Sequence, residues 1–342
     1  MTASLKPIQH RAAWVGDELK QCREWNFKLS PEEIDELLVI ARETEVAFDG
    51  PVEKDESPES LPLLTSKAAD IRDLLEEGSG AIRVTGFPAN DVDERTTKCA
   101  FWHLCRNIGT PVSQAATGVR LFDVRDAGFA DNDNRARGPN TRKKLSFHTD
   151  RCDVIGFLCY RQAKSGGENL VVSSVSMFNT MLAERPDLVE VLMQPFLYQR
   201  HNVDTGNETK YLEQPVFSIY EGHFASNLLR VLIDRAYAMS DTPDMTDIQR
   251  EALDYMEQLA SRETLHTRFR QEQGDMLFLN NFVTLHRRTE FTDYEEPERK
   301  RHLLRIWLSM PNSRPLHPSF SGNYGDTRAG AIRGGMRPSA TK

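Results

Sequence analysis

His148 and Asp150, in the run Leu-Ser-Phe-His-Thr-Asp-Arg-Cys-Asp, constrain the fold of this chain more than any other pair of residues. Side chains two positions apart point to the same side only on an extended strand. On a helix the same spacing would separate them by roughly 200°. We therefore expect a strand that carries an imidazole and a carboxylate side by side. Such a pair lacks one histidine of a 2-His-1-carboxylate metal site, and because it also occurs by chance on surface strands, a second histidine is needed.

The composition is that of a globular rather than a disordered protein. The chain has 342 residues, of which 39% are hydrophobic and 27% charged, and its length allows one large domain or two ordinary ones. The net charge is −8 and no basic run exceeds three residues, which disfavours non-specific nucleic-acid binding and leaves a local basic channel as an open alternative. No apolar run approaches the ~20 residues of a membrane span, and the N-terminus lacks the apolar core of a signal peptide. We expect a cytoplasmic protein with no membrane partner; a homo-oligomer is compatible with the sequence.

The cysteines favour a reducing compartment. Their number is odd and none has Cys-x-x-Cys spacing, so neither a disulfide framework nor a zinc site is indicated. We expect five free thiols, at Cys22, Cys99, Cys105, Cys152 and Cys159.

The N-terminal part of the chain predicts helices. Ser30, Pro31 and Glu33 form a helix start with a capping box, and the helix should run to about Phe48. Further helices are expected over 66–77 and 93–107, on either side of a buried strand within 80–88. The stretch 126–144 is rich in Asp, Asn, Arg and Gly and predicts a long loop, a candidate lid.

From Leu145 onward the pattern is mostly that of short strands. They are expected over 154–160, 170–174, 196–202, 216–220, 275–279 and 303–308, with helices over 175–185 and 246–261. We predict an α+β, mainly β fold with a double-stranded β-helix (jelly-roll) core and flanking helices. Residues 1–79 would be a helical extension packing on the barrel, 80–310 the jelly-roll domain, and 311–342 a C-terminal tail that meanders over the surface.

A second histidine and two arginines follow at suitable places. In Gly-Asp-Met-Leu-Phe-Leu-Asn-Asn-Phe-Val-Thr-Leu-His, a strand, a turn at Asn280 and Asn281 and a second strand would return His286 toward the barrel core. Downstream, Arg301 and Arg305 share one face of a strand by alternation, whereas His302 should point away. A guanidinium there can hold a carboxylate with two parallel hydrogen bonds.

The order His-x-Asp, distal His, Arg-x-x-x-Arg resembles the Fe(II)/2-oxoglutarate dioxygenases, more narrowly the taurine dioxygenase and clavaminate synthase-like superfamily that includes asparagine oxygenase. The resemblance covers roughly 80–308, and the segment His-Arg-Arg-Thr-Glu-Phe from His286 is close to the family's His-Gly-Arg-Thr-x-Phe. It implies that His148, Asp150 and His286 bind iron. It also implies that Arg301 grips the distal carboxylate of 2-oxoglutarate and that Arg305 lies near the substrate or the inner carboxylate of the co-substrate.

Two positions depart from the family pattern. Asn169 stands where taurine-type members carry a Thr that touches 2-oxoglutarate, and Asn can still donate a hydrogen bond. Arg287 replaces the usual Gly after the distal histidine, which would narrow or charge the mouth of the pocket. The carboxylate at Asp150 argues against halogenation, since halogenating relatives have a small residue there.

The implied activity is oxidative decarboxylation of 2-oxoglutarate to succinate and CO2, coupled by O2 to hydroxylation or desaturation of an unactivated C–H bond. The substrate would be a small, anionic or zwitterionic molecule such as an amino acid or a derivative. Three alternatives stay open: a non-catalytic metal-binding barrel or sensor, a nucleic-acid demethylase on the same fold, and a zinc hydrolase. Arg301 argues against the first and the last, and the acidic net charge against the second.

The remaining candidates have ordinary structural interpretations. The other histidines are expected on the surface or in packing, and Cys152 and Cys159 as small buried hydrophobic residues. Arg305 has a structural alternative, an ion pair with Glu295, Glu296 or Glu298. Arg287 and Arg288 are equally compatible with a pocket and with the surface.

Overall fold

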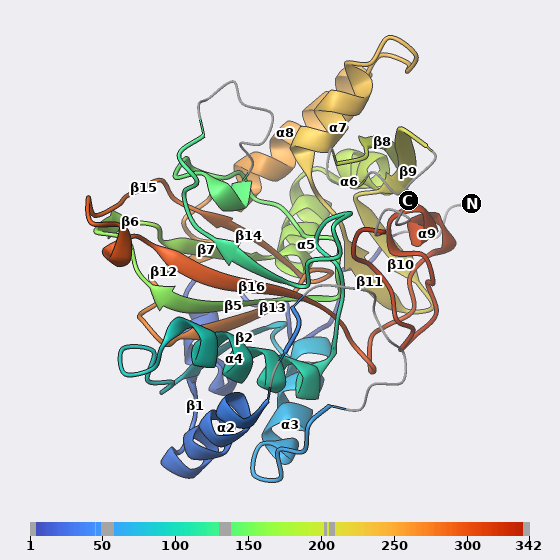
Figure 1. Ribbon diagram of the computed structural model, residues 1–342. Coiled ribbons are helices and arrows are strands. Elements are labelled where there is room, and N and C mark those ends of the chain that lie inside the picture. The colour runs from blue at the N-terminus through green and yellow to red at the C-terminus, as the bar shows by residue number, and fades with distance from the viewer. Residues whose placement is uncertain are drawn as a thin grey trace.

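The computed structural model describes residues 5–44, 46–48, 58–129, 138–201, 204 and 209–337, and it shows a mixed α/β fold (Figure 1). The larger sheet has seven strands in the order β1-β2-β13-β5-β16-β3, with β4 also paired to β16. Only the β1–β2 pair is parallel. The strands are β1 (Phe27–Lys28), β2 (Ala81–Thr85), β3 (Thr110–Pro111), β4 (Leu121–Val124), β5 (Val154–Arg161), β13 (Met276–Asn280) and β16 (His302–Ser309).

A second, three-stranded antiparallel sheet has the order β12-β7-β14. Its strands are β12 (His266–Phe269), β7 (Asn169–Ser173) and β14 (Thr284–Arg288). Val171 of this sheet packs in one buried cluster with Ile155, Leu277 and Trp307 of the larger sheet, so the two sheets enclose a common interior. Two-stranded ribbons complete the β-structure: β6 (Ser165–Gly166) with β15 (Phe291–Thr292), β8 (Pro195–Gln199) with β9 (Tyr211–Pro215), and β10 (Phe217–Tyr220) with β11 (His223–Ser226).

Helices cover the outside in two groups. The helices α2 (Pro31–Glu43), α3 (Thr65–Glu76) and α4 (Glu94–Ile108) lie together against the larger sheet (Figure 1). The helices α5 (Ser174–Glu184), α6 (Pro186–Leu192), α7 (Arg230–Tyr237) and α8 (Asp247–Ala260) gather around the smaller sheet and the ribbons. Short pieces are α1 (Glu18–Gln21), α9 (Ser321–Tyr324) and the 3-10 turns η1 (Arg23–Asn26), η2 (Gly138–Asn140), η3 (Pro297–Arg299) and η4 (Pro318–Phe320).

Most of the predicted elements are confirmed, with shifted ends. Ser30 caps α2 through the predicted capping box with Glu33, but the helix ends at Glu43 rather than near Phe48. Phe48 instead uses its main-chain oxygen to accept the N–H of Arg120, which draws the chain away from the helix axis. The strands β5, β7, β13 and β16 and the helices α3, α4, α5 and α8 lie within one or two residues of their predicted ranges.

The expectation that the C-terminal tail meanders over the surface is wrong for its described part, 311–337. Arg314, Phe320, Tyr324 and Arg333 are all buried, with exposed fractions of 4% or less. Phe320 and Tyr324 pack with Phe282 of the β13–β14 turn, an apolar contact that Pro/Gly/Ser/Arg-rich composition does not reveal. None of the helices in the described ranges is both long and apolar enough to cross a membrane.

Candidate metal centre

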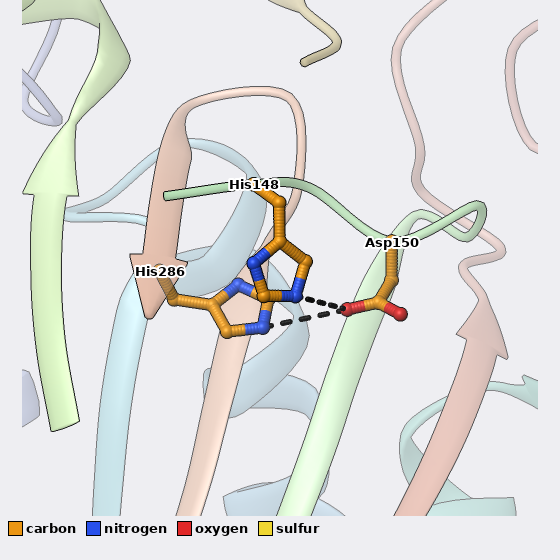
Figure 2. Close-up of side chains that lie close together, drawn as sticks. All are labelled: His148, Asp150 and His286. Atoms are coloured by element: carbon orange, nitrogen blue, oxygen red, sulfur yellow. Dashed lines mark ion pairs between the residues drawn. The ribbon is translucent and has the colours of Figure 1, made fainter. Parts of the chain in front are cut away.

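His148 and His286 are brought together by their main chains. The N–H of His148 donates to the oxygen of His286 (3.0 Å), and the N–H of His286 donates to the oxygen of His148 (3.1 Å). Residues paired in this way in an antiparallel bridge point to the same side. Their imidazole rings accordingly lie with centroids 4.5 Å apart, His286 projecting from β14 (Figure 2).

Asp150 reaches the same point from a turn, not from the strand that the sequence predicted. Only His148 makes a bridge here; the chain then bends over 151–153 before β5 begins at Val154. Asn281 stabilises this turn because its Oδ1 accepts the N–H of Asp150 (2.9 Å) and its Nδ2 donates to the oxygen of Cys152 (3.1 Å). The expected convergence of the two side chains is present, but a hydrogen-bonded asparagine produces it.

The three side chains fit a first-row divalent metal ion. Asp150 Oδ2 lies 3.4 Å from His286 Nε2 and 3.8 Å from His148 Nε2. A metal binds such nitrogen and oxygen ligands at about 2.0–2.2 Å, so both separations are below the ~4.2 Å that two ligands of one ion can span. Asp150 Oδ2 is also buried without a hydrogen-bond partner among the described residues. An unpaired buried carboxylate oxygen is costly, and a bound cation would satisfy it.

The protonation states of His148 and Asp150 also favour the binding of a cation, because the imidazole is neutral and the carboxylate is ionised. Burial, with the neighbouring His286, lowers the pKa of His148 to about 4, so its imidazole is neutral at pH 7. His148 Nδ1–H donates to the oxygen of Ser146 (2.8 Å), which leaves the lone pair on Nε2. Burial alone would raise the pKa of Asp150, but the contact with His286 and the charge of Arg305 outweigh it, and the pKa lies below its usual range.

Arg301 is a buried cation whose guanidinium pairs with no carboxylate in the part of the chain that the structure describes. The residue is 2% exposed, and its Nε and Nη1 have no hydrogen-bond partner among the described residues. Its guanidinium lies 5.1 Å from the ring centroid of Phe291, and only its main-chain N–H contacts an acid, Asp293 (2.7 Å). Burial lowers the pKa of Arg301 to about 10. An incoming carboxylate would supply the missing partner.

Arg305 faces the metal centre and is held there by Gln114. Its Nη1 lies 3.5 Å from Asp150 Oδ1, and its Nε–H donates to Gln114 Oε1 (2.7 Å). Gln114 Nε2 donates in turn to the main-chain oxygen of Arg305 (2.9 Å). The expected alternative, an ion pair of Arg305 with an acid of 295–298, is wrong: its carboxylate neighbour is Asp150, because strand alternation directs the side chain inward.

The candidates all border one cavity of about 910 Å³. His148, Asp150, His286, Arg301 and Arg305 line it, as the sequence analysis required. Asn169 lines the cavity too, as do the two arginines that follow His286, Arg287 and Arg288. Asn169 donates to Gln271 Oε1 (3.0 Å), and Arg287 stacks over the ring of Phe147 at 4.7 Å.

The predicted lid, 126–144, is described only at its two ends, and 130–137 lie outside the described residues. At the C-terminal end, Gly138, Pro139 and Lys144 line the cavity. Arg288 holds this end, because its Nη2 donates to the main-chain oxygens of Thr141 (2.8 Å) and Lys143. The C-terminal end of the segment therefore lies at the cavity, next to Arg288.

His302 points away from Arg301, as predicted. His302 Nε2 contacts Asp123 Oδ1 (2.7 Å), and Glu94 is also close enough for the three to hold a metal geometrically. Lys98 and Arg125 already pair with these carboxylates, Lys98 at 2.8 Å from Glu94 and 2.9 Å from Asp123. The cluster is therefore a charge-balanced network on the outer side of β16. All five cysteines are free thiols, as expected.

Gln114 and Asn281 are the two site residues that sequence reasoning did not identify. Neither belongs to a charge pattern or a ligand motif. The run Asn280-Asn281 was interpreted only as a turn, although an asparagine next to a buried strand end is a residue that can bond main-chain groups of another segment.

Comparison with known proteins identifies the family. Residues 48–307 match the family described as taurine catabolism dioxygenase TauD, TfdA family. The chain belongs to this family, and it is an Fe(II)- and 2-oxoglutarate-dependent oxygenase, as the sequence motifs implied.

Individual relatives agree with this assignment. The chain is 28% identical to the FR-33289 synthase of Streptomyces rubellomurinus (strain ATCC 31215) over 332 residues, 95% of this chain and 97% of that protein. Asparagine oxygenase in complex with Fe(II), 2S,3S-3-hydroxyasparagine and succinate has a similar fold, with a TM-score of 0.62, 19% identity, and coverage of 83% and 93%. The oxygenase OrfP with Fe, succinate and (3S)-hydroxy-L-Arg superposes with a TM-score of 0.63 at 14% identity, covering 83% and 94%.

Proposed function

We propose that this protein hydroxylates an unactivated C–H bond of a small anionic or zwitterionic molecule, such as an amino acid or an amino-acid derivative. In this proposal His148, Asp150 and His286 hold the Fe(II) and Arg301 holds 2-oxoglutarate. The observation that carries the proposal is the meeting of Asp150 Oδ2 with the two imidazoles, 3.4 and 3.8 Å away, in one cavity with Arg301. Together they form a facial ligand set beside a buried guanidinium whose Nε and Nη1 have no partner within the described ranges.

The co-substrate would lie between the metal and Arg301. The free Nε and Nη1 of Arg301 would donate to the distal carboxylate of 2-oxoglutarate. Asn169, whose Nδ2 already donates to Gln271, borders the same cavity and has an oxygen that can only accept. The bond to Gln271 uses one N–H of Nδ2, and in this proposal the second N–H donates to the co-substrate.

Arg305 would select the substrate. Its Nη1 lies 3.5 Å from Asp150 Oδ1, and its guanidinium lies 5.3 Å from the ring centroid of Phe122 and 5.2 Å from that of Trp307. Burial lowers its pKa, which means that the charged form lacks full compensation. A substrate carboxylate, sulfonate or similar group beside the metal would provide it. The amino acids in the asparagine oxygenase and OrfP complexes support this substrate class.

When bound, Fe(II) and 2-oxoglutarate would supply, with O2, an oxidative decarboxylation in which one oxygen atom of O2 enters succinate, CO2 is released and the other oxygen atom is added to the substrate. The chain's own part is to hold the His148 imidazole neutral, to keep Asp150 ionised, and to orient two anions by two arginines. The side chains of Arg301 and Arg305 are themselves buried, with exposed fractions of 2% and 7%, which limits the access of water to their charges and strengthens such contacts.

The proposed domain architecture is that of the TauD, TfdA family. We infer that the larger and the smaller sheet are the two faces of a double-stranded β-helix within residues 80–310. Residues 1–79 would be an extension packing on it, with β1 adding one strand, and 311–342 the tail. The segment 126–144 would act as a lid whose C-terminal end is held by Arg288.

The proposal is tested by succinate release. Purified protein with Fe(II), 2-oxoglutarate and ascorbate would be incubated under air with a panel of L-amino acids, N-acyl amino acids, sulfonates and amines. We expect stimulated succinate formation and a product heavier by one oxygen only with members that carry an acidic group. Stimulation by amines that lack an acidic group would contradict the proposed role of Arg305.

A further inference from the structure

The C-terminal tail returns to the turn that carries Asp150. The N–H of Gly335 donates to the main-chain oxygen of Arg151 (2.8 Å), and Arg151 Nε–H donates to the oxygen of Gly335 (2.7 Å). These two bonds hold the residue that directly follows Asp150. We name residues 150–153 the metal-binding turn and residues 333–335 the tail clasp.

Gly334 allows the tail clasp to approach this closely. Its φ is +77°, a conformation that side chains disfavour, and a Cβ there would lie 2.8 Å from the oxygen of Arg151 and 3.2 Å from Cα of Cys152. Both neighbours are main-chain atoms, so they cannot rotate away. Any side chain at this position would therefore push the tail and the metal-binding turn apart.

Arg333 holds the other end of the metal-binding turn. Its Nε lies 2.7 Å from Asp153 Oδ1, in an ion pair whose side chains are 0% and 2% exposed. The second oxygen of Asp153 accepts the N–H of Met310 (2.8 Å). Asn281 completes the arrangement, since its own N–H donates to the main-chain oxygen of Asp153 (2.9 Å). Each residue from Asp150 to Asp153 is thus bonded to Asn281 or to the tail clasp.

We propose that the tail clasp is a positioning element of the metal centre: it fixes the metal-binding turn so that the Asp150 carboxylate meets the two histidines. The inference rests on the proposed ligand set. The segment lies beyond residue 307, where the match to the family ends. The histidines do not need it, because their main chains bond each other, whereas Asp150 has no strand to hold it. Groups that orient a metal ligand are worth roughly 10- to 100-fold in metal affinity.

Two glycine substitutions provide a matched test. Gly334→Ala and Gly325→Ala place the same methyl group at two tail glycines with similar positive φ values, +77° and +74°. A Cβ at Gly325 meets nothing within 4 Å, whereas that at Gly334 meets the metal-binding turn. Co(II), whose visible absorption reports its ligands, would be titrated into each metal-free protein, and the melting temperature of each would be recorded. We expect roughly 10- to 100-fold weaker Co(II) binding for Gly334→Ala and wild-type affinity for Gly325→Ala.

Equal Co(II) affinities of these two variants would overturn the proposal, even if both melt earlier. If Gly334→Ala does not fold, Arg333→Lys and the exposed control Arg328→Lys decide in its place, with the same two outcomes. If His286→Ala instead binds Co(II) as tightly as the wild-type protein does, the proposed ligand set is wrong. The failure of the tail clasp and that of the metal site are therefore distinguishable.

Discussion

His148 and His286 exchange two main-chain hydrogen bonds, of 3.0 and 3.1 Å, so the distance between two of the three proposed metal ligands is fixed by the backbone. The imidazoles do not need the ion to bring them together. This relationship makes the site preformed, in contrast to small domains that fold only around their metal.

Removal of the metal should therefore leave the fold intact. We expect the chelated protein to keep its far-UV circular dichroism, with a lower melting temperature that recovers when Fe(II) or Co(II) is added. The stabilisation should follow ligand linkage, about 2.7 kcal/mol at a metal concentration of 100 times Kd. Loss of secondary structure on chelation would show that the two histidines depend on the ion.

Arg301 should determine the affinity for 2-oxoglutarate. A charge-assisted hydrogen bond is worth roughly 1.5–3 kcal/mol, so Arg301→Ala should weaken binding by roughly 10- to 100-fold. Arg301→Lys keeps the charge but not the two parallel donors, and we expect an intermediate loss. Calorimetric titration with 2-oxoglutarate measures both, with the exposed Arg328→Ala as control. Unchanged affinity in both Arg301 variants would move the co-substrate elsewhere, to Arg305 in the first instance.

Gln114 should affect the substrate and not the co-substrate. Gln114→Glu would place a carboxylate against Nε of Arg305, 2.7 Å away in the wild type, and would compensate its charge. We expect the KM of an active acidic substrate to rise roughly tenfold, about 1.4 kcal/mol, while the affinity for 2-oxoglutarate stays the same. Gln114→Leu, which removes the contact without adding charge, should have a smaller effect on KM. A fall in 2-oxoglutarate affinity alone would assign Arg305 to the co-substrate.

The metal-free protein should lose stability on acidification through His148. Its pKa is lowered from 6.5 to about 4 in the folded state, so the unfolded chain binds the proton more tightly. The stability that this group contributes is present above pH 6.5 and is lost as the pH falls from 6.5 toward 4. We expect His148→Gln to show a shallower decrease of melting temperature over this range. Identical pH profiles would mean that the pKa of His148 is not lowered in the folded protein.

The end of the proposed lid should respond to the co-substrate. Arg142, Lys143 and Lys144 are exposed, and Arg288 holds the main chain beside them. Arg288 and Arg301 stack on the same ring of Phe291, at 4.7 and 5.1 Å, and their charges repel. A dicarboxylate bound to Arg301 would relieve that repulsion. We expect 2-oxoglutarate with Fe(II) to slow tryptic cleavage at 142–144, and equal cleavage rates would contradict a coupled lid.

Secondary structure and side-chain orientation could be predicted from the sequence where hydrophobic periodicity or a helix cap determines them. The capping box at Ser30 and Glu33 located α2, and alternation on β16 correctly placed Arg301 and Arg305 on the cavity side and His302 outside. The order of ligand-type residues then led to the family.

The sequence was less informative where side chains bond distant main chains. Asp150 was expected on a strand, but Asn281, 131 residues away, holds it in a turn. The tail from 311 was expected on the surface because its composition is that of a loop, yet Arg333 finds a buried partner in Asp153, 180 residues away. Such contacts depend on the assembled fold and leave no local pattern. The strand β4 and the helix α7 are short, which explains why no prediction covered them.

The central claim is that His148, Asp150 and His286 bind one Fe(II) to which 2-oxoglutarate also binds. Anaerobic addition of Fe(II) and 2-oxoglutarate should produce the weak visible charge-transfer band of the chelated co-substrate. We predict the band in the wild-type protein and its loss in His148→Ala and in His286→Ala, with the fold of both variants checked by circular dichroism. A full band in either variant would contradict the account.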